Sequence, residues 1–310
     1  MKLNDLLGIE HPIIVAPMFL ISNVDMVVVA CENGATAAFP ALNYRTDEEL
    51  KGAIAEIKRR TKKPFGVNLI VNKSNPKAAH QLALLVEEKV DFIITSLGSP
   101  QQTIELCKPH GIKVFCDVTN LEYAQKVEAL GADAVIAVTN RAGGHCGSEA
   151  PEKLIPHLVK NLSIPVIAAG GVANKQHVDA MMEMGASGVS VGTVFLACKE
   201  ANISEDYRQA LIEYGEKDIV LTTKMSGSHL TVINTPYVQS IGTKATFLER
   251  LMNRNKRLKK FIKMLIFIRG MKAIENAASK ATYKTVWCAG PSIEYIHSIR
   301  PLKEILKDLT

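Results

Sequence analysis

Short apolar segments alternate with amphipathic stretches from residue 10 to about residue 196. The apolar segments recur at intervals of roughly 20 to 30 residues, which is the length of a strand, a helix and two loops. There are eight: 12–18, 35–42, 65–71, 91–98, 113–120, 133–140, 165–171 and 188–195. Because they are apolar on both faces, they are typical of strands buried in a parallel sheet.

The stretches between these segments predict helices. Residues 46–61, TDEELKGAIAEIKRRT, begin with Thr46 as an N-cap and run from acidic to basic residues, which matches the helix dipole. Residues 120–133 begin at Asn120 and predict a helix that stops at Gly131. Eight such units favour an α/β fold of the (β/α)8 TIM-barrel type, with a doubly wound open sheet as the alternative.

Polar residues and glycines gather at the carboxyl ends of the apolar segments, which in a barrel share one mouth where active sites lie. This gathering is a second reason to prefer the barrel. After about residue 200 the pattern changes: residues 204–215 predict a helix, and the Thr-rich residues 219–242 predict irregular structure. We therefore expect a barrel formed by residues 1–199 and 286–310, with a smaller, partly helical second domain, 200–285, inserted as a lid over the substrate.

The composition is that of an ordinary globular protein, with 47% hydrophobic and 22% charged residues. The six cysteines contain no CxxC pair, so we expect no metal site and reduced thiols. The N-terminus does not resemble a signal peptide, and no apolar run reaches the roughly 18 residues of a membrane-spanning helix. These features predict a cytoplasmic protein with no transmembrane segment.

The net charge of +6 is concentrated in one segment. Residues 249–272 hold nine Lys or Arg and one Glu, whereas the rest of the chain has 28 basic and 30 acidic residues. This distribution does not indicate a nucleic-acid-binding protein. The basic segment is most simply a lid helix with a solvated face. The alternatives are a docking surface for an acidic partner, such as an acyl carrier protein, or for a membrane surface.

Two glycine-containing turns follow the seventh and eighth apolar segments. Gly170 and Gly171 lie in AAGGVAN, and Gly192 and Thr193 lie in VGT. Backbone amides in such turns, each just before a helix, form an anion cradle. In barrels this position commonly holds a cofactor phosphate.

The segment NRAGGHCG, residues 140–147, places His145 among small residues. Glycine is costly to order, so this frame indicates close approach of a ligand. A histidine here can act as a general base or a hydrogen-bond donor. Cys146 is a weaker candidate nucleophile, because no basic group accompanies it. We expect the other histidines to make ordinary structural contacts.

PIIVAPM, KPFGVNL, AGGHCG, IPVIAAGG and VGTVF, in this order, resemble the nitronate monooxygenase (2-nitropropane dioxygenase) family. The scaffold is also similar to FMN-dependent enoyl-acyl-carrier-protein reductases. The resemblance implies FMN at the barrel mouth and His145 as the catalytic residue. It further implies FMN contacts from Pro17, Met18, Asn68 and Gly143, and phosphate contacts from Gly171, Ser190, Val191, Gly192 and Thr193.

The activity implied is oxidation of alkyl nitronates with dioxygen to a carbonyl compound and nitrite. The alternatives are an enoyl-acyl-carrier-protein reductase that uses NAD(P)H and a flavin-binding protein without catalysis. A homodimer is compatible with either enzyme. Two residues depart from the family pattern: Arg141 precedes the AGGH sequence, and Asp117 stands where some nitronate-oxidising members carry Lys.

Overall fold

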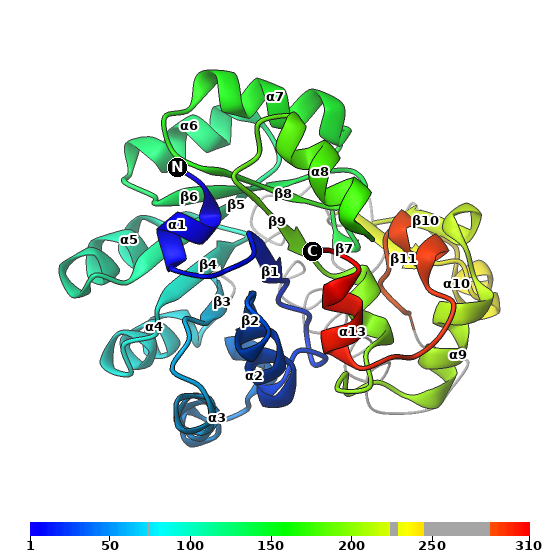
Figure 1. The fold of residues 1–310 in the computed structure, drawn as a ribbon, viewed down its shortest axis with the longest axis horizontal. Coiled ribbons are helices and arrows are strands. Elements are labelled where there is room, and N and C mark those ends of the chain that lie inside the picture. The colour runs from blue at the N-terminus through cyan, green and yellow to red at the C-terminus, as the bar shows by residue number, and fades with distance from the viewer. Residues whose placement is uncertain (73–74, 224–228, 245–285) are drawn as a thin grey trace, which may run out of the picture.

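The computed structural model describes residues 1–72, 75–223, 229–244 and 286–310. Eight parallel strands close into a barrel with helices around it (Figure 1). The barrel strands are β1 (Ile13–Val15), β2 (Thr36–Pro40), β3 (Gly66–Ile70), β4 (Phe92–Ser96), β5 (Lys113–Val118), β6 (Ala134–Val138), β8 (Val166–Ala169) and β9 (Gly188–Val191). Each lies within one of the eight apolar segments, so the predicted (β/α)8 barrel is confirmed. Pairing of β1 with β9 closes the sheet and rules out the open-sheet alternative.

One helix follows each of the first seven barrel strands. These helices are α2 (Val24–Glu32), α3 (Asp47–Arg60), α4 (Ala78–Glu87), α5 (Gln101–Cys107), α6 (Leu121–Ala129), α7 (Pro151–Asn161) and α8 (Lys175–Glu183). The N-caps predicted from the sequence are present. Thr46 and Glu49 form a reciprocal capping box at the start of α3, and the Asn120 side chain accepts from the Tyr123 backbone at the start of α6.

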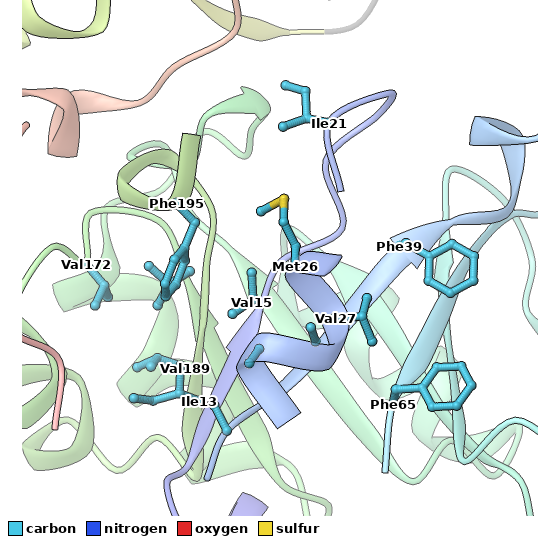
Figure 2. Packing of buried hydrophobic residues seen from close by; sticks show 14 of the residues in the cluster. Ile13, Val15, Ile21, Met26, Val27, Phe39, Phe65, Val172, Val189 and Phe195 are labelled. Atoms are coloured by element: carbon cyan, nitrogen blue, oxygen red, sulfur yellow. The ribbon is translucent and has the colours of Figure 1, made fainter. Parts of the chain in front are cut away.

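Alternate residues of each strand face opposite sides of the barrel wall. Val114, Cys116 and Val118 of β5 pack outward against the helices, whereas Phe115 packs inside the barrel. Figure 2 shows Val15 of β1 and Met26 of α2 in this outer layer. The same alternation assigns Asp117 to the interior, at the carboxyl end of β5.

Large side chains fill the end of the barrel that lies opposite the mouth. The rings of Phe92 and Phe115 stack there with centroids 5.0 Å apart. Leu3 of α1 (Leu3–Leu7) belongs to the same buried cluster, so α1 closes the end opposite the mouth. These side chains therefore form a well-packed floor beneath the open mouth of the barrel.

A second, antiparallel sheet lies beside the barrel mouth (Figure 1). It consists of β10 (Ile219–Thr222), β11 (Leu230–Ile233) and β7 (Gly144–His145), in the order β10-β11-β7. The expectation of irregular structure over 219–242 is therefore wrong for its described residues, which also form α10 (Pro236–Ile241). The second half of the AGGH sequence is a short strand rather than a free turn, because β11 supplies backbone partners for Gly144 and His145.

The remaining described elements are helices. The predicted helix near residue 204 is confirmed as α9 (Glu205–Glu213). The short 3-10 helices are η1 (Ala41–Asn43), η2 (Lys108–His110), η3 (Thr193–Ala197), η4 (Glu216–Asp218) and η5 (Pro291–Tyr295), and the last helix is α13 (Leu302–Lys307). α13 packs against α2 and η3. Among the residues described, no helix is both long enough and apolar enough to cross a membrane.

Candidate active site

A cavity of about 680 Å³ opens at the carboxyl ends of the barrel strands. This volume is within the range of about 300–1,000 Å³ typical of small-molecule sites. Every site residue expected from the sequence lines it: Pro17, Met18, Asn68, Gly143, His145, Gly170, Gly171, Ser190, Val191, Gly192 and Thr193. The barrel thus brings together residues that are up to 176 positions apart, from Pro17 to Thr193.

The predicted anion cradle has a backbone geometry that requires glycine. Gly170 and Gly171 have φ angles of 109° and 83°. A Cβ on Gly170 would lie 2.4 Å from the Ala142 backbone nitrogen, so this turn and the AGGH segment are in direct contact. Gly192 differs, because a Cβ there would meet nothing closer than the Ala16 Cβ at 3.7 Å. A side-chain Cβ at Gly192 would therefore make only ordinary van der Waals contacts with the protein.

His145 is held at the cavity by the small sheet. It pairs with Leu230 of β11. The Thr231 hydroxyl donates to the Ala142 carbonyl at 2.5 Å. The imidazole is accessible from the cavity, yet protein surrounds the site, and this desolvation lowers the pKa of His145 from its ordinary 6.5. Desolvation therefore favours the neutral imidazole.

Cys146 does not have the surroundings of a nucleophile. Burial raises the pKa of its thiol, and no cation stabilises the thiolate among the influences on it. Within the described ranges, no group of three or more His, Cys, Asp or Glu side chains is arranged to hold a metal ion.

The cavity floor carries a hydrogen-bond chain across three neighbouring strands. The Asn68 amide donates to the Ser96 Oγ at 2.7 Å, and the Ser96 hydroxyl donates to the Asp117 Oδ2 at 2.5 Å. Burial raises the pKa of Asp117 to about 6, partly opposed by the bond from Ser96. The sequence pointed to Asn68, but it did not link Asn68 to Asp117.

One wall of the cavity comes from residues beyond 200, none of which was named individually as a site residue from the sequence. They are Tyr207, His229, Leu230, Val286, Cys288 and Ser292. The Tyr207 ring stacks on Trp287 with centroids 5.3 Å apart, and its hydroxyl donates to the Cys288 carbonyl at 2.6 Å. The β-branched run Thr231–Ile233 was the sequence signal that a strand lies here.

Arg141 lies at the rim of the cavity. Its guanidinium forms an ion pair with Glu152 at 2.8 Å, and a Cβ on Gly171 would lie 3.0 Å from the Arg141 Cδ. Arg141 therefore packs on the glycine turn and is also part of the cavity lining.

Comparisons with known proteins agree with this geometry. The family model described as nitronate monooxygenase matches residues 1–310. A probable nitronate monooxygenase of Staphylococcus aureus is 30% identical, over 77% of this chain and 80% of its own. A Rhodococcus jostii protein is 32% identical, over 77% of this chain and 67% of its own. It is named (3aS,4S,5R,7aS)-5-hydroxy-7a-methyl-1-oxo-octahydro-1H-indene-4-carboxyl-CoA dehydrogenase.

Solved structures share the whole fold. FabK from Thermotoga maritima is 29% identical, with a TM-score of 0.86 over 100% of this chain and 94% of its own. Nitroalkane oxidase from Streptomyces ansochromogenes, at 22% identity and a TM-score of 0.81 over 99% of this chain and 96% of its own, shares the fold. The chain therefore belongs to the nitronate monooxygenase family and is an oxidoreductase of that family.

Proposed function

We propose that this protein is an FMN-dependent oxidoreductase that oxidises alkyl nitronates with dioxygen, giving a carbonyl compound and nitrite. One observation carries the proposal: a neutral histidine, His145, faces the same cavity as a glycine-lined anion cradle. Family membership supports the reaction class.

The residues present fit a flat ring with a phosphate tail. Gly170 and Gly171 form consecutive left-handed positions, a backbone arrangement that suits an anion. Gly192 lines the cavity without a side chain, which lets a ligand approach its backbone. Gly170, Gly171, Ser190, Val191, Gly192 and Thr193 would hold the phosphate, and Pro17, Met18, Asn68 and Gly143 would contact the ring.

FMN, when bound, supplies the electron-transfer chemistry, and the protein supplies orientation and electrostatics. The neutral His145 imidazole can accept the α-proton of a nitroalkane or donate a hydrogen bond to a nitronate oxygen. Because desolvation lowers the pKa of His145, it stays neutral at pH values where a solvated histidine begins to protonate. The pH dependence of nitroalkane oxidation should therefore show its acidic limb below pH 6.5.

A second candidate is reduction of an enoyl thioester with NAD(P)H. It is favoured by the similarity to FabK and by the relative named for a carboxyl-CoA substrate. The acidic partner proposed for residues 249–272 concerns a segment outside the described residues.

Anaerobic bleaching of the flavin absorption band distinguishes the two candidates. FMN-loaded protein is mixed with an alkyl nitronate in one cuvette and with NADH or NADPH in another. Rapid bleaching by the nitronate alone supports the proposal. Bleaching by the nicotinamide alone contradicts it and supports the thioester reductase.

Replacing the histidine tests its role in the same assay. We expect His145→Gln to retain FMN and to slow bleaching by a nitroalkane by about 10²- to 10⁴-fold, the usual contribution of a general base. His157→Gln is the matched control, because His157 is exposed on α7, away from the cavity lining. An unchanged rate in His145→Gln would contradict the assignment.

A further inference from the structure

A carboxyl group with no counter-cation lies on the floor of the cavity. Asp117 is at the carboxyl end of β5, and its Oδ2 accepts from Ser96, which is held in turn by Asn68. These three side chains come from β3, β4 and β5, and all three line the cavity. The chain of bonds fixes the orientation of Asp117 through one oxygen and leaves its other oxygen without a hydrogen bond from the described residues.

Arg141 and His145 line the same cavity as Asp117, but neither forms an ion pair with it. No described Lys, Arg or His lies within ion-pair distance of it. On β6, the residue paired with Asp117 is the apolar Ile136, and Ile94, deeper on β4, is also apolar. The titratable neighbours are Cys116 and Tyr123, and both have pKa values raised by burial, to about 12 for Cys116. They are neutral near pH 7, so the charge of Asp117 is neither paired nor cancelled.

The barrel topology places this carboxyl group on β5, next to the strands that lie across the mouth from the anion cradle. In the closed order β1-β2-β3-β4-β5-β6-β8-β9, strand β4 is opposite β9, and β3 is opposite β8. The cradle residues follow β8 and β9. A molecule anchored there by a phosphate, with a flat ring extending across the mouth, would cover the ends of β3, β4 and β5.

We propose that Asp117 faces the bound flavin and that its negative charge makes the flavin harder to reduce. This inference rests on the proposed FMN function. The flavin gains negative charge when it accepts electrons, and a carboxylate in a poorly solvated cavity opposes that charge strongly. Reduction is then accompanied by uptake of one further proton from water by Asp117. Below about pH 6, where burial keeps Asp117 protonated, the effect disappears.

The test is the midpoint potential of the bound flavin between pH 5 and pH 8.5. FMN-loaded full-length protein is reduced stepwise in the presence of a reference dye, and the spectrum gives the reduced-to-oxidised ratio. Asp117→Asn keeps the shape and removes the charge. At pH 8 and a fixed potential, we expect the reduced-to-oxidised ratio of the flavin to be at least about tenfold higher in Asp117→Asn than in the wild type. The plots of midpoint potential against pH for the two proteins should converge at pH 5.

Two further variants test whether the effect is specific to the charge of Asp117. Asp179→Asn removes one exposed carboxylate from α8 and should follow the wild type at every pH. In the wild type, the plot of midpoint potential against pH should change slope near pH 6, where Asp117 loses its proton. Ser96→Ala removes the hydrogen bond that lowers the pKa of Asp117, so this break should move to higher pH. That break is visible in the wild type alone, so the test survives if Asp117→Asn does not fold.

Parallel curves for wild type and Asp117→Asn, or a wild-type curve without a break, would overturn the inference. Failure of the proposed reaction looks different: the flavin is bound and titrates as expected, but nitronate does not bleach it. A protein that binds no FMN would overturn both.

Discussion

At the scale of single residues, two glycines of the cavity differ in what surrounds them. Replacing one tests ligand binding, and replacing the other tests folding. A Cβ on Gly192 would meet only ordinary contacts, whereas one on Gly170 would meet the Ala142 nitrogen at 2.4 Å with a φ of 109°. We expect Gly192→Ala to fold normally and to bind FMN at least about tenfold more weakly, since about 1.4 kcal/mol of lost contact has that effect. Fluorescence quenching of FMN measures the affinity.

Gly170→Ala should instead destabilise the protein itself, by about 1–3 kcal/mol, because its backbone conformation is strained for alanine. Gly52→Ala is the control for glycine replacement as such. Gly52 lies in α3, and a Cβ there would have no other atom within 4 Å, so alanine should slightly stabilise the helix and leave FMN binding unchanged. Normal FMN affinity in Gly192→Ala would contradict the assignment of the cradle.

At the scale of elements, strand β11 positions the histidine strand β7 through Thr231. Its hydroxyl donates to the Ala142 carbonyl at 2.5 Å, within the segment that leads to His145. We expect Thr231→Val to lose about 1–3 kcal/mol of stability, since a buried carbonyl loses its partner. We also expect kcat to fall about tenfold or more with FMN affinity unchanged, because small displacements of a catalytic group are costly.

Thr36→Val is the matched control for that change. The Thr36 hydroxyl is equally buried and donates to the Pro64 carbonyl at 2.7 Å, but Thr36 begins β2, at the end of the barrel away from the mouth. It should lose similar stability and keep its kcat. Equal losses of kcat in the two variants would show that β11 has no specific role in positioning His145.

At the scale of the whole molecule, Asp117 makes stability depend on pH. Its pKa rises from 3.8 to about 6 on folding, so its contribution to stability is fully present below about pH 4 and is lost as pH rises through 6. In FMN-free protein, the free energy of unfolding of Asp117→Asn relative to that of wild type should therefore increase by up to about 3 kcal/mol as the pH rises from 4 to 8. Urea unfolding at both pH values measures this, and an unchanged difference between the two proteins would contradict it.

The order of strands and helices was predictable because its signals are local. Apolar segments of strand length, Thr46 and Asn120 at N-caps, and glycines after β8 and β9 each depend on neighbours within a few residues. The expected cavity residues could be named in the same way, because every parallel strand of a barrel ends at one mouth. Their roles toward FMN remain predictions.

Three features of the site depend on contacts between distant residues, and the tertiary structure alone shows them. β7 is a strand only because β11, some 85 residues later, supplies hydrogen-bond partners to Gly144 and His145. Pairing of β3 with β4 and of β4 with β5 places Asn68, Ser96 and Asp117 side by side on successive strands. Finally, the lowered pKa of His145 results from desolvation, and desolvation depends on all the atoms around a group rather than on its neighbours in the chain.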